Sequence, residues 1–502
     1  MLLLLACQTP ADSTADSPAV VESASPSGSW STETFPACEA PLSEAHWTAS
    51  ELLPEIGYDP PVNDNLVGIE PGSIALFDAP SGPILLYTDT SGTARGYWLA
   101  DGSSVDGLSN LRGLASFSIG DIDGDGLLDL VASGPVVNLL WDYDGSWKNV
   151  TELRTNDEVF VRDTVLADFD GDGDLDLLLT RSGPLDDPAT LQASLVENLG
   201  DRKLADPVPV PAPADFWGKT FDATAVDLSG DGAPEVFFCN DLGATFAPNA
   251  LLSNDGKGGL SPATDALGLD FRSSCMGLAL GDLDHDGDLD ISLSDAVRHY
   301  FLLQVEGGFV DASASAAIPV LANQQMYWGN SITDLDNDGR NELVLPSSWF
   351  WTLSARPFPV YALSETDSGA WEDHGEAWGF PQRAGTRTVL VQDLNDDGLQ
   401  DLIFGDGWRT PHLLLSDGCT SAGWIEVEAP EGTLIQVDLG DQTVAGRVSR
   451  DGSYGSAGRA RLHLGTGARS SVVSVTAQVP WKGEFMLDGP IPTRSRVTLE
   501  ID

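Results

Sequence analysis

Short apolar runs, separated by turns rich in glycine, aspartate and proline, follow one another along most of the chain. The apolar residues do not recur with helical spacing, so the pattern predicts strands and almost no helix. In one recurring unit an acidic stretch leads at once into an apolar run, as in DFDGDGDLDLLL at residues 168–179. Because carboxylates packed this closely repel one another, folding them against a hydrophobic strand requires a neutralising partner.

The acidic unit occurs six times, and the starts of successive copies are 47, 59, 55, 52 and 59 residues apart. This spacing suits one four-stranded blade per repeat better than a helical solenoid unit. A seventh unit at Gly72–Thr88 has a strand, a turn and a strand but lacks the aspartates. We therefore predict an all-β fold with a seven-bladed β-propeller over residues 55–422, in which the first blade is degenerate. Rings of six or eight blades are the alternatives.

Each copy places acidic, amide or hydroxyl side chains at positions 1, 3, 5 and 9 and a glycine at position 6. Alternate residues of a tight turn point toward a common centre, the glycine permits the bend, and position 7 offers its backbone carbonyl. A set of oxygen ligands of this kind favours Ca²⁺ over transition metals and over Mg²⁺. Position 12 is apolar and lies in a β-type run, so the loops are not EF-hands.

The sequence thus predicts up to six Ca²⁺ ions as cofactors, with metal-free Asp-Gly turns as the alternative. The copies that start at Asp227 and Asp393 have Ser229 and Asn395 at position 3, so each offers three carboxylates and is expected to bind the ion most weakly. The predicted ligands are Asp121, Asp123, Asp125, Leu127 and Asp129; Asp168, Asp170, Asp172, Asp174 and Asp176; Asp227, Ser229, Asp231, Ala233 and Glu235; Asp282, Asp284, Asp286, Asp288 and Asp290; Asp334, Asp336, Asp338, Arg340 and Glu342; and Asp393, Asn395, Asp397, Leu399 and Asp401.

The 502 residues include 77 acidic and 25 basic side chains, which give a formal net charge of −52. This charge argues against nucleic acid or an anionic membrane surface as the main partner and favours cations. No segment approaches the roughly 20 apolar residues that a membrane helix needs. Membrane contact is therefore expected only through a lipid anchor, and the chain is expected to be a monomer.

Residues 1–7, MLLLLAC, resemble a bacterial lipoprotein signal in which Cys7 becomes lipidated, although no Lys or Arg precedes the apolar run. An ordinary apolar N-terminus is the alternative. Residues 8–54, rich at first in Ser, Ala, Thr and Pro, predict a flexible tether between the anchor and the folded body. The expected location is the bacterial cell envelope, with the anchor at the outer membrane or cell surface, or the medium after secretion.

If Cys7 carries a lipid, four cysteines remain, and an even number in an exported protein suggests two disulfides with three possible connectivities. We prefer the pairs Cys239 with Cys275 and Cys38 with Cys419, the second of which would tie the start of the folded body to its end. Four unpaired buried thiols are the alternative if the protein is not exported.

The loops resemble the FG-GAP/VCBS repeats of integrin-α-type β-propellers, and GLALGDLDHDGDLDISLSD at residues 277–295 is similar to the repeats of cartilage acidic protein-like chains. Those chains carry a C-terminal ASPIC/UnbV domain. Residues 423–502 resemble that domain in their short strands, in the turn at residues 452–456 and in the element LHLGTG at residues 462–467. The resemblance implies an extracellular calcium-binding protein with a binding or adhesion role. The alternation of apolar and polar residues in this C-terminal segment itself predicts a small all-β module that docks on the propeller.

Two classes of function follow. The first is an exported surface protein whose propeller binds a glycan or protein partner, with Ca²⁺ fixing the blade loops. The alternative is a calcium-stabilised hydrolase or lyase acting on an extracellular polysaccharide. No HExxH, GxSxG or phosphate-cradling loop stands out, so no catalytic residue is predicted. Tryptophans near the blade loops could stack on sugars, with core packing as the simpler role, namely Trp217, Trp328, Trp349, Trp351, Trp378 and Trp408.

Overall fold

The computed structural model describes residues 28–42, 45–53, 72–143, 147–153, 160–243, 245–264, 267–296, 298–316, 325–349, 357–366, 368–383, 385–407 and 409–501. The predicted lipidation site Cys7, residues 8–27 of the predicted tether, Trp351 and Trp408 lie outside these residues. Helix in the described residues is limited to two short turns, η1 (Pro188–Thr190) and α1 (Ser313–Ala316). The other elements are strands, as the apolar pattern predicts.

Seven sheets follow one another along the described part of the propeller region, and neighbouring strands within them are mostly antiparallel. Sheet by sheet, their strands are β3 (Ile74–Ala79), β4 (Gly82–Thr88) and β5 (Ala94–Trp98); β6 (Ser116–Gly120), β7 (Asp129–Ser133), β8 (Val137–Tyr143) and β9 (Trp147–Leu153); β10 (Val161–Ala167), β11 (Asp176–Arg181), β12 (Ser194–Val196) and β13 (Val208–Pro209); β14 (Lys219–Val226), β15 (Glu235–Asp241), β16 (Ala250–Asn254) and β17 (Leu260–Pro262); β18 (Cys275–Gly281), β19 (Asp290–Asp295), β20 (Tyr300–Val305) and β21 (Gly308–Asp311); β22 (Gln325–Tyr327), β23 (Ser331–Thr333), β24 (Glu342–Trp349), β25 (Phe358–Glu365), β26 (Trp371–Asp373) and β27 (Gln382–Arg383); and β28 (Thr386–Gln392), β29 (Asp401–Asp406), β30 (His412–Ser416) and β2 (Trp47–Ala49).

The sheets are arranged in a ring. Neighbouring sheets contact one another through β3, β6, β10, β14, β18, β23, β28 and back to β3. Each pair of neighbouring sheets shares a hydrophobic cluster, and the cluster of Ile74, Leu85 and Ile403 joins the last sheet to the first. Because such a ring covers both faces of a blade, strands such as β7 and β15 are buried at every residue. The predicted all-β propeller is confirmed.

The first sheet obtains a strand from the other end of the chain. β35 (Ser456–Ala457), with β34 (Asp451–Gly452) beside it, lies next to β3 and pairs with it in parallel, Ala75 opposite Ala457. β3 and β4 form the predicted hairpin, but they stand where the second and third strands of the other sheets stand. The missing aspartates now have a reason: in the described residues this sheet has no inner strand of its own that could lead into an acidic loop.

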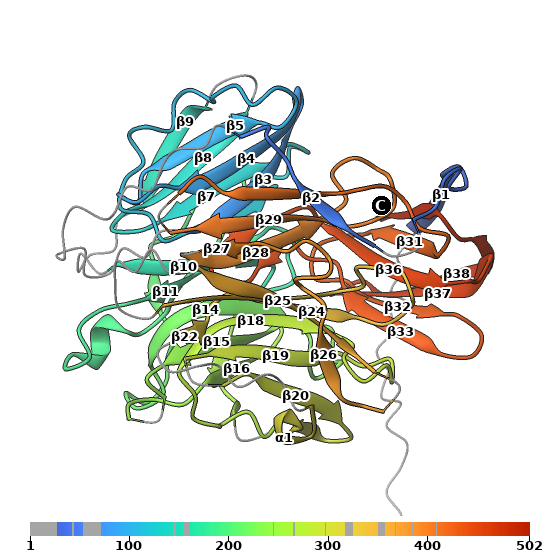
Figure 1. The fold of residues 1–502 in the computed structure, drawn as a ribbon. Helices are drawn as coiled ribbons and strands as arrows, with labels where there is room; N and C mark the ends of the chain where they lie inside the picture. Colours follow the sequence, from blue (N-terminus) through green and yellow to red (C-terminus); the bar gives the residue numbers. More distant parts are fainter. Residues whose placement is uncertain are drawn as a thin grey trace, which may run out of the picture.

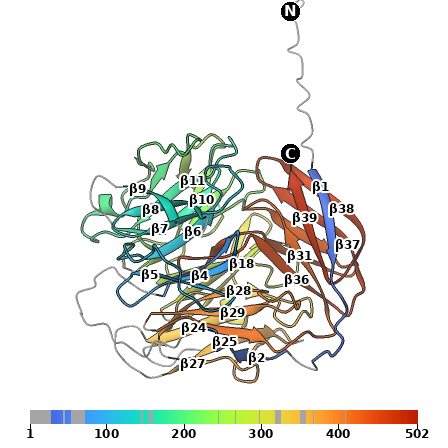
Figure 2. The ribbon, with the colours of Figure 1, turned by 90° about the horizontal axis from the view of Figure 1, so that it is seen from above.

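The prediction of a flexible tether is wrong for two segments of residues 8–54. β1 (Gly28–Thr34) pairs along its whole length with β39 (Ser495–Ile501), and β2 forms the outer strand of the seventh sheet. Figure 2 shows β1, in blue, among the red strands of the C-terminal end. Small polar residues suggested a linker, but seven consecutive backbone pairings and the packing of Trp30 on the apolar core of the C-terminal β unit hold this segment in place.

Both disulfides that the sequence favoured are present. Cys38 is bonded to Cys419, across 381 residues, and Cys239 is bonded to Cys275, between β15 and β18 of neighbouring sheets. Cross-links between distant segments stabilise mainly by restricting the unfolded chain. The N-terminal segment is therefore fixed to the last sheet by β2 and to the segment that follows this sheet by a covalent bond.

A second β unit, which we call the module, comprises residues 423–501 together with β1 and is drawn mostly in red in Figure 1. Its two four-stranded sheets enclose one apolar core, with strand orders β1-β39-β31-β36 and β33-β32-β37-β38. The module confirms the small all-β unit that the tail predicts. Its remaining strands are β31 (Gly423–Glu428), β32 (Leu434–Asp438), β33 (Thr443–Arg447), β36 (Arg461–Gly467), β37 (Ser471–Val479) and β38 (Gly483–Pro492).

The module's segment 449–458 enters the space enclosed by the inner strands of the propeller. Tyr454 is 2% exposed and packs on Phe221 of β14 and on Trp328, with ring centroids 6.2 and 5.4 Å apart. The Tyr454 N–H donates to Asp222 Oδ2 at 2.9 Å, and the Ser453 carbonyl accepts from Thr388 Oγ1 at 2.9 Å. The segment thus plugs the ring and joins blades that lie far apart in sequence.

Tyr454→Ala is expected to lower the free energy of unfolding by about 3 kcal/mol, because it removes a buried ring and leaves a cavity at the centre of the propeller. Tyr454→Phe, which keeps the ring, is expected to lose much less. Urea unfolding followed by tryptophan fluorescence measures both. Equal midpoints for Tyr454→Ala and the wild type would contradict a structural role of this plug.

Candidate metal centre

Each acidic loop joins the inner strand of a sheet to the second strand. Position 9 is the first residue of that second strand, as Asp129 begins β7 and Asp176 begins β11. The same connection recurs in six consecutive sheets of one ring, so the six loops lie at the same end of the propeller. Each position-9 carboxylate is therefore anchored on a buried strand, and the preceding positions form the turn above it.

The loop backbone bends at two positions. The position-6 glycines all have a φ between 87° and 99°, in the left-handed region that glycine adopts without strain. The position-4 residues also have a positive φ, between 55° and 80°. Where position 4 is not glycine it is His285, Asn337 or Asp396, the residue types that tolerate this region best. Alternate side chains consequently turn toward the inside of the loop.

Three hydrogen bonds recur in all six loops and orient the acidic side chains. The position-9 carboxylate accepts the position-2 N–H at 2.7–3.1 Å. The position-1 carboxylate accepts the N–H of the position-6 glycine at 2.8–3.2 Å. The position-5 carboxylate accepts the position-7 N–H at 2.8–3.0 Å. These bonds fix the carboxylates before any ion is considered.

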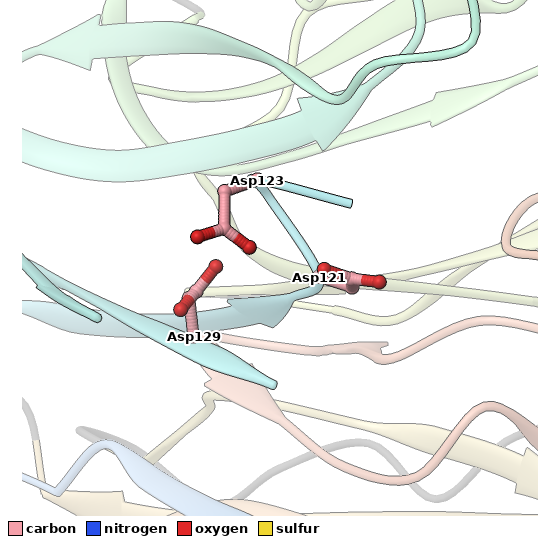
Figure 3. Close-up of side chains that lie close together, drawn as sticks. All are labelled: Asp121, Asp123 and Asp129. Atoms are coloured by element: carbon pink, nitrogen blue, oxygen red, sulfur yellow. The ribbon is translucent and has the colours of Figure 1, made fainter. Parts of the chain in front are cut away.

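In five of the loops, three acidic residues bring one ligand oxygen each to within 4.8 Å of one another. Figure 3 shows Asp121, Asp123 and Asp129 around such a common space. The other groups are Asp168, Asp170 and Asp176; Asp227, Asp231 and Glu235; Asp282, Asp284 and Asp290; and Asp334, Asp336 and Glu342.

The structure brings together positions 1, 3 and 9 of the prediction more closely than position 5. In four of the five groups the position-5 aspartate lies outside the group, and its carboxylate accepts the position-7 N–H. The 227–235 loop differs, since position 3 is Ser229 and Asp231 at position 5 takes its place. The predicted carbonyl ligands at position 7 stay a prediction, and they are Leu127, Asp174, Ala233, Asp288, Arg340 and Leu399.

The sixth loop does not gather three acidic residues in the described structure. Asn395 replaces the position-3 aspartate, and its Nδ2 donates to Asp397 Oδ2 at 3.0 Å. Ser416 Oγ donates to the same oxygen at 2.5 Å. Asp397 is thus occupied by protein donors, so this loop suits an ion least.

The loop at residues 121–129 has a competing cation. The Arg202 guanidinium forms an ion pair with Asp123 and lies 3.6 Å from an oxygen of Asp125. One positive charge of the protein therefore offsets part of this acidic group, and a metal ion would bind beside it or displace it.

Burial makes these carboxylates hard to ionise without a cation. It raises the pKa of Asp176, Asp282 and Asp290 to about 7. Burial, followed by repulsion from neighbouring aspartates, raises the pKa of Asp334 and Glu342 well above the usual range. A divalent cation in their midst would reverse this penalty, because opposite charges favour the ionised form.

Two orphaned oxygens show that the donor set fits a cation. Asp282 and Asp334 are 0% and 2% exposed, and the Oδ1 atom of each is buried without a hydrogen-bond partner. An unpaired buried carboxylate oxygen costs free energy, which a hard cation would recover. Ligands that are all oxygen, on a tight loop with several carboxylates, match the preference of Ca²⁺.

The candidate tryptophans that the structure describes are core residues. Trp217, Trp328 and Trp378 are 3%, 4% and 8% exposed and belong to hydrophobic clusters of the propeller. The side chain of Trp349 is not among those described. Stacking of a sugar on the three described rings would require them to leave the core.

A cavity of about 170 Å³ between the inner strands and the module contains groups with shifted pKa values. Burial raises the pKa of Asp222 to about 7 and that of Asp451 to about 8, and it lowers the pKa of His463 to about 3. Shifts of this kind can mark acid-base chemistry. Here, however, Asp222 Oδ2 already accepts the N–H groups of Leu278 and Tyr454. The carboxylate anchors the module, and this contact gives no support to a hydrolase or lyase.

Sequence reasoning missed the module residues that contact the acidic loops. Trp481 donates from Nε1 to the Asp168 carbonyl at 3.0 Å and from its backbone N–H to the Gly232 carbonyl at 3.1 Å. Gln436 and Gln442 donate to the carbonyls of Gly287 and Gly339. No local signal could have identified them, since each stands more than 100 residues from its partner in the sequence.

Among the described residues, no helix is long and apolar enough to cross a membrane. A sequence profile described as FG-GAP-like repeat matches residues 121–179 and 227–293, which contain four of the six acidic loops. Human cartilage acidic protein 1 is 24% identical over 317 residues, a match that covers 58% of this chain and 46% of that protein. The chain thus spans less than half the length of this relative.

Two solved structures are distantly similar. A lectin of Agrocybe aegerita, described as recognising non-reducing terminal N-acetylglucosamine, is 16% identical with a TM-score of 0.38, over 74% of this chain and 94% of the lectin. The WD40 domain of Neurospora crassa Pan2 is 9% identical with a TM-score of 0.44, over 74% of this chain and 96% of the domain. From its own sheets and from the matched segments, the chain is an all-β propeller that carries FG-GAP-like repeats.

Proposed function

We propose that this chain is an exported, calcium-binding β-propeller that acts as a surface binding module for a glycan or a protein partner. The observation that carries the proposal is the convergence of three acidic side chains in each of five loops, two of which contain an orphaned buried oxygen. The residues at positions 1, 3 and 9, with Asp231 at position 5 of its loop, would hold the ions. Calcium would supply the positive charge between these carboxylates, and the protein would supply the tight loop that positions them.

The role of the ion is structural in this proposal. Each loop connects the inner strand of a blade to its buried second strand, so neutralising the loop fixes the register of both. The end of the propeller that carries the six acidic loops is partly covered by the module. We therefore assign the binding of a partner to the opposite end of the ring, where loops from several blades lie side by side on a rigid scaffold.

Export is supported by the two disulfides, because disulfides persist in oxidising compartments. A lipid anchor on Cys7 and a place in the bacterial cell envelope are part of the proposal. So is the assignment of residues 423–502 to an ASPIC/UnbV domain. The turn at residues 452–456, on which that resemblance partly rests, lies in the centre of the ring, where the Tyr454 N–H donates to Asp222.

Calcium removal is expected to lower the melting temperature strongly. An ion that binds only the folded chain stabilises it by about 2.7 kcal/mol per site when it is present at 100 times its Kd. Differential scanning fluorimetry with Ca²⁺, with EGTA and with Mg²⁺ measures the effect, and Mg²⁺ is expected to restore little. Asp284→Asn should weaken the calcium response, whereas Asp187→Asn, an exposed residue outside the loops, should not. A melting curve that EGTA does not move would contradict structural calcium.

Calcium uptake is expected to release protons, with an affinity that falls as the pH drops below about 7. In the metal-free loops, burial raises the pKa of Asp282 and Asp290 to about 7, so at lower pH protons occupy the oxygens that the ion must bind. Titration calorimetry in two buffers of different ionisation enthalpy counts the protons. An affinity that stays constant down to about pH 5, with no proton release, would show that these carboxylates do not bind the ion.

Binding of a partner is tested directly with a glycan array and a panel of bacterial surface proteins, probed with the purified chain in Ca²⁺ and in EGTA. We expect retention on one ligand class in Ca²⁺, and loss of it in EGTA, because the ions order the propeller. Turnover of an extracellular polysaccharide without retention would favour the hydrolase or lyase instead.

A further inference from the structure

The module covers the acidic loops to different degrees, and the position-6 glycines measure this coverage. Gly126 and Gly173 are exposed, and no atom beyond their chain neighbours lies within 4 Å of a Cβ built on them. Gly287, Gly339 and Gly398 are buried, and module side chains or backbone lie within 4 Å of a Cβ built on each of them. Three loops therefore lie beneath the module, and we call the two of them that gather three acidic residues, at 282–290 and 334–342, the covered loops. The loop at 121–129 is open at its position-6 glycine, and the loop at 168–176 is open at Gly173 but is contacted by Trp481 at Asp168 and Gly171.

At the first covered loop, the module contacts both the turn and an acidic ligand. Gln436 Nε2 donates to the Gly287 carbonyl at 2.7 Å. The Ala445 N–H of β33 donates to Asp282 Oδ2 at 3.3 Å. Asp282 Oδ1 is the orphaned atom of the same carboxylate. One oxygen of this ligand thus faces the module, and the other remains for a cation.

At the second covered loop, the module backbone lies closer to the acidic residues. Gln442 Nε2 donates to the Gly339 carbonyl at 3.2 Å, and the Gly467 N–H donates to the Asn337 carbonyl at 2.9 Å. A Cβ on Gly465 would lie 2.0 Å from Asp334 Oδ2, so only glycine permits β36 to approach this loop. Asp334 Oδ1 is again buried without a partner.

The sixth loop provides a contrast, because arginines connect it to the module. Arg496 forms an ion pair with Asp396 at 2.8 Å, and Arg459 Nη1 donates to the Asp393 carbonyl at 3.2 Å. Protein cations reach this loop, which does not gather three acidic residues in the described structure. At the two covered loops, the described hydrogen bonds from the module come from neutral groups. The buried carboxylates there lack a charged partner from the module in these contacts.

We propose that divalent cations in the two covered loops latch the module onto the propeller, and that the module in turn traps these two ions. The ion orders the loop whose carbonyls accept Gln436 and Gln442, and the module closes the path by which the ion leaves. Linked equilibria are reciprocal, so the ion strengthens docking by the same factor by which docking strengthens ion binding. The inference rests on the proposed calcium loading and adds a division of the sites into trapped and open ones.

The trapping is tested by ion release into a fluorescent chelator in a stopped-flow instrument. Two ions of the calcium-loaded wild type are expected to leave about tenfold more slowly than the rest, a factor within the usual range of coupling between linked sites. Gly465→Ala should move one of them into the fast phase, because its Cβ pushes β36 away from Asp334. Gly28→Ala, where the new Cβ meets mainly the Phe485 ring within the module, is the matched control and should release ions as the wild type does.

The latch is tested by hydrogen exchange with mass spectrometry in saturating Ca²⁺. The double variant Asp284→Asn and Asp336→Asn should lose protection in the peptides that contain Ala445 and Gly467, whose amides donate to the covered loops. Asp123→Asn, in an open loop, should keep it. Peptides from β14 and β15, away from both substitutions, report whether the propeller remains folded.

The outcomes separate this inference from the calcium proposal. Absence of bound calcium would refute both. Bound ions that all leave in a single phase, or a slow phase unchanged in Gly465→Ala, would refute the latch alone. If the double variant unfolds as a whole, the release kinetics of Gly465→Ala, which alters no acidic residue, still decide.

Discussion

Repulsion among half-buried carboxylates is the constraint on which this structure depends. Five times around the ring, acidic side chains from the end of one strand and the start of the next lie within 4.8 Å of one another. They stand where the inner strand of a blade turns into its buried second strand. An interaction that neutralises them therefore also sets the turn and the register of two strands. These charges repel one another, and a cation bound among them would turn the same charges into ligands that order the loop.

The repeated part of this architecture could be predicted from the sequence because its determinants are local. The glycine at position 6, the alternating oxygen ligands and the apolar run that follows all lie within twelve residues of one another. The backbone angles and the recurring hydrogen bonds agree with that pattern loop by loop. The cysteine pairs followed from an equally simple consideration, since one of them ties the two ends of the folded body together.

The remaining features depend on contacts between residues that are hundreds of positions apart. Nothing in GSWSTET indicates a strand that pairs with the last residues of the chain, yet β1 and β39 are paired over seven positions. The first sheet lacks aspartates because β35 of the module lies beside β3, a contact between Ala75 and Ala457. Position 5 was expected among the closest ligands, but in four loops its carboxylate lies outside the group of three acidic residues.

Propeller and module form one structure. The module fills the centre of the ring with Tyr454 and rests on the loops that would hold the ions, so ion binding would be linked to blade register and docking. The central claim is tested most directly by native mass spectrometry of the chain, purified with Ca²⁺ and exchanged into a metal-free volatile buffer. At least two, and at saturation five, Ca²⁺ ions per chain are expected from the five acidic groups. A chain that remains folded and carries no bound calcium at any free concentration would contradict the claim.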